Sequence, residues 1–218
     1  KSSEFTLRKA VEVRYPDTMT ELSIKSEMIA GTIAEEIIRG EHSPGARLAQ
    51  DAIASRFQCS HVPVREALQR LIQMELATSA PRKGVRVVAL TSSDHLEIQE
   101  MRLALEPLAL RLPVAAKQGR GQKEIEGHRL SCDGAVDAIS WESANRAFHM
   151  AILKPCGRHR LLGQIEKLQR LSAHNFHTKW QKKWAQSSDR DHASIVRAIQ
   201  AGDAEAACAI LVRHLRRV

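Results

Sequence analysis

The chain has 218 residues, of which 43% are hydrophobic, so it is long enough to bury the core of one large domain or two ordinary ones. It carries 33 Lys and Arg against 25 Asp and Glu, which gives a formal net charge of +8. This composition excludes a disordered tail. The basic excess favours an anionic partner and leaves nucleic acid, acidic small molecules and membrane surfaces open.

The cysteines and the apolar runs bear on the expected cellular location of the protein. The four cysteines are scattered and form no CxxC pair, so neither a disulfide framework nor a cysteine-based zinc site is indicated. No apolar run approaches the ~18 residues of a membrane span, and the first residues lack the apolar segment of a signal peptide. We therefore expect a cytoplasmic protein with no membrane partner.

Three short helices and a hairpin are predicted over residues 21–90, after a flexible extension over 1–20. The expected elements are helices from Ile24 to Gly40, over about 48–57 and from about 61 to Leu76, followed by strands over 76–78 and 85–88. Pro81-Arg82-Lys83-Gly84 has turn chemistry and separates the strands. This order predicts a winged helix-turn-helix, in which the hairpin is the wing.

Residues 91–218 change to a helical period without a convincing strand, so an all-helical bundle domain is expected. Thr91 to Asp94 form an N-cap cluster, and Pro107 should kink the helix that follows. The expected helices span about 93–112, 122–138, 141–154, 159–185, 189–201 and 203–216. The fold class is thus mainly α, with the winged domain first and the helical domain second.

The third helix has the amphipathic pattern of a DNA-recognition helix. Its apolar residues share one arc, and its polar residues, among them Arg65 and Gln69, share the opposite arc. Because the first turn of such a helix meets base edges in a major groove, we assign His61, Val62 and Arg65 to DNA contact. Ser60 and Gln69 are assigned to the same DNA-binding surface. Ser60 is expected to cap the free backbone donors of the first turn.

Basic residues of the wing extend this predicted surface. Arg82, Lys83 and Arg86 are expected to reach the DNA backbone or the minor groove. The alternative is an ordinary amphipathic helix with a solvated charged face, which the adjacent wing makes much less favourable.

Four residues of the second half form a candidate metal site. Asn145 and His149 are four apart and share a helix face, and His192 and His214 lie in apolar-periodic surroundings on later helices. Three neutral imidazoles and a side-chain oxygen suit a divalent Zn, Ni, Fe or Mn ion. On spacing alone, a core histidine bonded to a backbone carbonyl is the commoner arrangement.

A metal-dependent hydrolase or lyase is the alternative function for such a histidine set. Glu142 and Glu166 are not placed beside the histidines by spacing, and no general base is evident. We therefore expect no enzyme activity.

Motifs of the first half resemble one family. They are Pro44-Gly45-Ala46-Arg47-Leu48, Ile53-Ala54-Ser55-Arg56-Phe57, Ser60-His61-Val62-Pro63-Val64-Arg65-Glu66-Ala67-Leu68-Gln69-Arg70-Leu71 and Arg82-Lys83-Gly84-Val85-Arg86-Val87. In this order they resemble the winged helix of the GntR family of bacterial transcription regulators, and Arg47 and Gly84 are assigned to the DNA-binding surface with them. The family usually has Arg or Lys at His61, Thr at Val62 and Gly at Glu75. These departures imply a different operator and a helix ending without glycine.

The second half is similar to the all-helical FCD ligand-binding domain of the FadR-type branch of that family. The similarity rests on Asn145-Arg146-Ala147-Phe148-His149, Asp191-His192-Ala193-Ser194-Ile195 and His214-Leu215. Metal-binding members use an Asp and three His, so the resemblance assigns a divalent metal to Asn145, His149, His192 and His214. The neutral amide oxygen of Asn145 is a weaker metal ligand than the Asp carboxylate that those members have at this position.

Members of this branch sense organic acids, often sugar acids, beside the metal. Arg102 can point into the bundle and bind a carboxylate, or it can pair with Glu106 one turn later. Trp180, with His174 and His177, lies on a stripe that lines the pocket or serves packing.

Together these patterns predict a homodimeric transcription regulator, most simply a repressor. Each subunit would read half of a palindromic operator in double-stranded DNA, and a small carboxylate effector would control that binding. A sensor whose effector is the metal itself is a further option.

Overall fold

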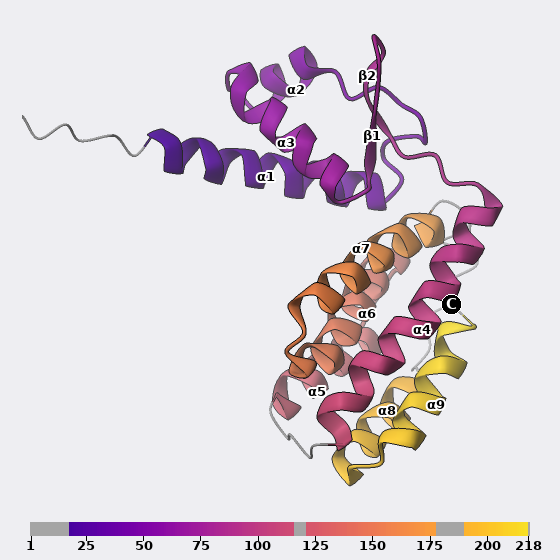
Figure 1. Ribbon diagram of the computed structural model, residues 1–218. Coiled ribbons are helices and arrows are strands. Elements are labelled where there is room, and N and C mark those ends of the chain that lie inside the picture. The colour runs from indigo at the N-terminus through magenta and orange to yellow at the C-terminus, as the bar shows by residue number, and fades with distance from the viewer. Residues whose placement is uncertain (1–17, 116–120, 178–189, 218) are drawn as a thin grey trace, which may run out of the picture.

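The structure is a computed structural model that describes residues 18–115, 121–177 and 190–217 (Figure 1). Its N-terminal part contains α1 (Thr18–Ile38), α2 (Gln50–Arg56), α3 (His61–Gln73), β1 (Ala77–Ala80) and β2 (Gly84–Val87). The expected winged helix-turn-helix is confirmed, although several boundaries differ, and β1 extends to Ala80 rather than ending at residue 78. Helix α1 begins at Thr18 rather than at Ile24, and α3 ends at Gln73 rather than near Leu76.

The apolar arc predicted for α3 is its buried face. Val64, Leu68 and Leu71 are fully or almost fully buried and belong to the same hydrophobic cluster as Ile33 and Ile37 of α1. Helices α1 and α3 therefore pack through their apolar faces, and the polar arc of α3 stays exposed. This arrangement presents the predicted recognition residues to the outside.

Helix α3 ends early because the chain turns into a left-handed conformation at Glu75, whose φ is +64°. The Glu75 N–H donates to the Ile72 carbonyl at 2.9 Å, and the Leu76 N–H donates to the Leu71 carbonyl at 3.1 Å. These two bonds form a Schellman ending, in which the left-handed residue is usually glycine. The helix thus ends without glycine, and Glu75 carries the backbone strain instead.

The wing is a two-stranded antiparallel hairpin, with Ala77 opposite Val87 and Ala80 opposite Gly84. Its turn is closed by the Lys83 N–H, which donates to the Ala80 carbonyl at 3.0 Å. The segment before α2 pairs with the outer side of β2, because an isolated bridge joins Arg47 to Arg86. The wing is therefore fixed to the loop between α1 and α2.

The C-terminal part is helical throughout the described residues. It contains α4 (Ser92–Ala115), α5 (Gln122–Asp133), α6 (Ala138–Leu153), a 3-10 turn η1 (Lys154–Cys156), α7 (His159–Asn175), α8 (Arg190–Ala201) and α9 (Ala204–Leu215). Helix α4 continues through Pro107, and the expected N-cap is present because the Asp94 N–H donates to the Thr91 hydroxyl. Helix α6 begins before residue 141, because the Asp137 carboxylate accepts from the Ser140 N–H at 2.7 Å. Helix α5 ends at Asp133 rather than near 138.

Helix α4 is the central element of the second domain, with α7 on one side and α9 on the other (Figure 1). The cluster that forms the core of the winged domain also contains Ile98 of α4 and Leu168 and Leu171 of α7. The two domains therefore share apolar packing as well as a chain connection. None of the helices in the described ranges is long and apolar enough to cross a membrane.

The strained ending of α3 gives the first prediction. Glu75→Gly should be more stable than Glu75→Ala by about 1 kcal/mol, because glycine adopts positive φ without the penalty that a Cβ imposes. Both variants lose the surface ion pair between Glu75 and Lys167, so alanine is the matched control. Urea denaturation measures the difference. A Glu75→Gly variant less stable than Glu75→Ala would contradict this account of the turn.

Candidate functional site

The predicted DNA-contacting residues of α3 are exposed. His61, Val62, Arg65 and Gln69 all lie on the surface, and the Val62 side chain is 53% accessible although it is apolar. Arg65 and Gln69 line an open hollow along the outer side of the helix. A protruding helix with this face uncovered has the form that a major groove accepts.

Ser60 is the N-cap residue of α3 by position, but its hydroxyl makes no capping hydrogen bond in the structure. The expected capping role is therefore wrong. The free donors of the first turn remain available to a phosphate oxygen. The His61 Nε2 lies 3.7 Å from the exposed Asp51 carboxylate, too far for a strong hydrogen bond.

The wing brings only part of the predicted basic set to the surface. Arg82, Lys83 and Gly84 are exposed at its tip, and the exposed Arg47 side chain passes 3.7 Å from the position that a Cβ on Gly84 would take. Arg86 differs, because its guanidinium donates to the Gly45 carbonyl at 2.8 Å. Arg86 is thus engaged in holding the wing to the preceding loop.

Three histidines from different helices converge inside the second domain. His149 of α6, His192 of α8 and His214 of α9 are at most 2% exposed, and one nitrogen of each lies within 4.8 Å of the other two. The Nε2 atoms of His192 and His214 are 3.3 Å apart. The predicted grouping of these residues is therefore present in space, and we call it the histidine cluster.

A buried carboxylate fixes one member of the cluster. The Glu106 side chain is fully buried, lies 2.7 Å from Arg102 Nε and lies 2.9 Å from His149 Nδ1. Burial would raise the pKa of Glu106, but the Arg102 charge and the contacts with His149 outweigh it and lower that pKa to about 2. An ionised carboxylate only accepts, so His149 donates from Nδ1, and in the neutral ring Nε2 then keeps the lone pair.

Burial keeps the other two imidazoles neutral. It lowers the pKa of His192 to about 3, with a further contribution from His149. It also lowers the pKa of His214 well below its ordinary value, and His149 and His192 add to the shift. Neutral imidazoles offer lone pairs to a cation, which protonated ones do not.

A small cavity beside the cluster is lined by polar groups. Asn145 and His149 line it from α6, and Gln169 and Ser172 line it from α7. Among the described residues, Asn145 Oδ1, His149 Nε2 and both amide atoms of Gln169 are buried without a hydrogen-bond partner. The cavity volume of about 20 Å³ is enough for one water molecule.

Two arrangements were predicted for Arg102, one pointing into the bundle and one paired with Glu106. The structure shows both, because the buried Arg102 side chain pairs with Glu106 inside the bundle. Its Nη1 donates to the Ser172 hydroxyl at 2.8 Å. Arg102 and Ser172 also border a larger groove of about 390 Å³, which Gln99, Asn175 and Arg216 help to line. Arg102 therefore separates an open groove from the buried cavity.

The aromatic and histidine stripe is only partly described. His174 Nδ1 lies 2.7 Å from the carbonyl of Ile37 in α1, and His177 Nε2 lies 3.6 Å from Glu142. These contacts favour the packing interpretation for both histidines. Trp180 lies outside the described residues.

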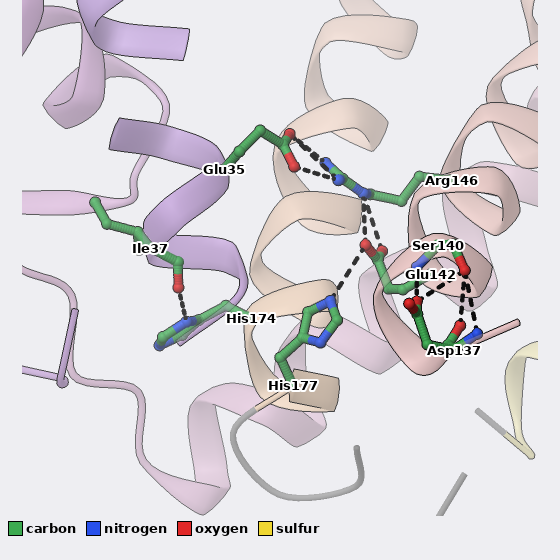
Figure 2. A network of polar contacts seen from close by, with 8 residues as sticks. All are labelled: Glu35, Ile37, Asp137, Ser140, Glu142, Arg146, His174 and His177. Atoms are coloured by element: carbon green, nitrogen blue, oxygen red, sulfur yellow. Dashed lines mark hydrogen bonds and ion pairs between the residues drawn. The ribbon is translucent and has the colours of Figure 1, made fainter. Parts of the chain in front are cut away.

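A polar network joins the cavity wall to the winged domain (Figure 2). Arg146 Nε lies 2.9 Å from Glu142, and Arg146 Nη2 lies 3.0 Å from Glu35 of α1. Figure 2 shows Arg146 between these two carboxylates, with His177 on the far side of Glu142. One guanidinium thus contacts both domains.

Sequence reasoning missed three of these relations. Glu106 was considered only as a partner of Arg102, and its contact with His149 depends on where α6 lies. Gln169 and Arg146 were not singled out, since polar residues at the edge of an apolar arc look like surface residues. The one signal in the sequence was an acidic residue four positions after an arginine on a helix that was expected to face the bundle.

Comparison with known proteins agrees with this geometry. Residues 25–87 match the family of bacterial regulatory proteins called the gntR family, and residues 97–217 match the FCD domain. The HTH-type transcriptional repressor GlaR of Escherichia coli is 28% identical over 196 residues, which covers 84% of this chain and 89% of GlaR. The HTH-type transcriptional regulator BphR of Paraburkholderia xenovorans is 29% identical over 197 residues, which covers 83% of this chain and 78% of BphR.

A solved structure shows the same fold. The structure of E. coli McbR/YncC has a TM-score of 0.77 at 22% identity and covers 88% of this chain and 94% of its own. The matched families and relatives are transcription regulators, so the chain is not an enzyme and the hydrolase or lyase alternative is unsupported. The chain belongs to the GntR family of bacterial transcription regulators and carries a C-terminal FCD domain.

Proposed function

We propose that two copies of this chain form a homodimer that represses transcription in the cytoplasm by binding a palindromic operator. The exposed first turn of α3 would read bases, and the basic wing tip and Arg47 would contact phosphates. Two-fold symmetry in the protein requires two-fold symmetry in its site. One relative, GlaR, is named a transcriptional repressor, which supports repression rather than activation.

We further propose that a small organic acid controls DNA binding from the FCD domain. The observation that carries this proposal is the set of unpartnered buried groups described above for Asn145, His149 and Gln169. Each such group costs roughly 1–3 kcal/mol, so a native fold that retains them favours a ligand at this place. Arg102 would take the carboxylate from the groove side, where a molecule of that size has room.

A divalent cation fits the donors beside this site. His149, His192 and His214 would hold it through neutral nitrogens, and Asn145 would offer an amide oxygen. The separation of 3.3 Å between the His192 and His214 Nε2 atoms is close to that of two nitrogens bound at about 2.0–2.1 Å to one tetrahedral zinc. When bound, the cation would supply a Lewis-acidic position for a carboxylate oxygen.

Arg146 would connect this site to the DNA-binding domain. Its guanidinium is shared between Glu142, which lines the cavity, and Glu35 of α1. A carboxylate group that reached past Arg102 from the groove into the cavity would compete with both carboxylates for Arg146. The contact with α1 would then weaken, and the orientation of the winged domain would change.

DNA recognition is tested by selecting binding sequences from random duplexes with the full chain. We expect a symmetric sequence, and Arg65→Ala should weaken its binding about tenfold to hundredfold, because a base contact is lost. Arg160 is an exposed arginine on α7 and gives the matched control, which should change binding by less than about twofold. A preference without symmetry, or equal losses in both variants, would contradict the proposal.

Effector control is tested by thermal unfolding of EDTA-treated protein with a panel of organic acids, each with and without added zinc. At a hundred times its Kd, a bound acid should raise the Tm by about 5–10 °C, and zinc should increase the shift. Gln169→Met should raise the Tm of the acid-free protein, because two buried unpaired atoms are removed, and should reduce the acid-dependent shift. Gln200→Met, at an exposed site on α8, should do neither. If Gln169→Met responds to every acid as the wild type does, the cavity is not the effector site.

A further inference from the structure

Val62 is an apolar residue on the outer side of the recognition helix. Across α3, all of which lies in the described ranges, it is the one large apolar side chain that is exposed, at 53%. Leu71, about two and a half turns later, is fully buried on the opposite side of the helix. Val62 therefore points away from the core, and its single rotatable bond cannot fold it back.

Polar residues surround Val62 on this side. Gln69 follows two turns later on the same line, Arg65 and Glu66 lie one turn later to either side of that line, and all three are exposed. Single exposed apolar residues are common on protein surfaces. Val62 differs from most of them because it lies in the middle of the face that the proposed function places in the major groove.

The major groove offers an apolar side chain one complementary group. Its base edges present hydrogen-bond donors and acceptors, and only thymine adds an apolar group, the 5-methyl. Against a phosphate or a polar base edge, Val62 would displace water and form no hydrogen bond in return. The exposed Glu66 carboxylate would also repel a phosphate, so the DNA backbone is the less favourable neighbour here.

We propose that Val62 is a specificity-determining residue that selects thymine at one position in each half of the operator. Its γ-methyl groups would pack against the thymine 5-methyl group. The inference rests on the proposed function and names a base that the bound sequence must contain.

The first turn of α3 holds Val62 in place for such a contact. The next two residues, Pro63 and Val64, are buried, and the proline ring fixes its own backbone angle φ. β-Branching gives valine one strongly preferred χ1 rotamer in a helix. The two methyl groups are therefore positioned before DNA binds, and little side-chain entropy is lost in the contact.

The neighbouring polar side chains read other features of the groove. His61 and Arg65 are both exposed and carry N–H donors, which match the acceptors of purine edges and phosphates. Such hydrogen bonds do not depend on a methyl group. A change that removes only the thymine methyl therefore tests Val62 separately from these two residues.

Deoxyuridine provides the test, because it keeps the hydrogen-bonding groups of thymidine and lacks the 5-methyl group. Each thymine of the selected symmetric duplex is replaced in turn, in both halves together, and the affinity of the full chain is measured by fluorescence anisotropy. At one position we expect replacement to weaken binding by about tenfold to twentyfold, because a buried methyl group contributes about fourfold in each half. 5-Methylcytosine should bind more tightly than cytosine there by the same factor.

The Val62→Ser variant shows whether this residue reads the methyl group. It removes both γ-methyl groups, so it should bind the thymine duplex more weakly by a similar factor and should lose nothing further with deoxyuridine. Val136→Ser is the matched control, because Val136 is 78% exposed in the loop between α5 and α6, and it should keep the full dependence on the methyl group. Circular dichroism checks that both variants retain the helical fold.

Two contrary results have different consequences. A symmetric duplex in which no thymine methyl affects binding, or in which deoxyuridine weakens Val62→Ser as strongly as the wild type, would overturn the assignment of Val62 and leave the repressor in place. A chain that selects no symmetric sequence would overturn both.

Discussion

The ion pair between Glu106 and Arg102, extended by the hydrogen bond from His149, is the interaction on which the regulatory domain depends. It connects α4 to α6 inside the bundle, and Arg102 adds a bond to Ser172 of α7. Removing one partner of such a buried pair costs about 3–5 kcal/mol, since the other charge is left without compensation. Because the pKa of Glu106 falls from 4.5 to about 2 on folding, the pair stabilises the fold above pH 4.5 and loses that effect as the pH falls toward 2.

The same carboxylate determines what the histidine cluster can do. By accepting from His149 Nδ1 it directs Nε2 toward His192 and His214, whose burial keeps them neutral. The cost of this arrangement is visible in the unpartnered groups around the cavity, which a purely structural core would avoid. Arg146 then connects this region to α1 through Glu35, and α7 also packs against α1 through apolar residues.

Much of the fold follows from local patterns in the sequence. The recognition helix was predictable because Val64, Leu68 and Leu71 repeat at helical spacing, and the same residues form its buried face. Boundaries were less predictable, because they depend on backbone conformation. Helix α3 ends at a left-handed Glu75, and α6 starts at an Asp137 cap that apolar spacing does not reveal. The family resemblance, rather than spacing, indicated that histidines from three helices meet. The carboxylate that orients one of them could be found only once α4 and α6 were placed side by side.

The protonation of His149 tests the central claim most directly. Nitrogen-15 NMR of the histidine rings in metal-free protein distinguishes the two neutral tautomers, and a His149→Gln variant assigns the resonance. The Glu106 contact predicts that the wild-type ring carries its proton on Nδ1, and that Glu106→Gln loses this preference. A wild-type His149 with its proton on Nε2 would contradict the account, because its lone pair would then point at Glu106 and away from the cluster.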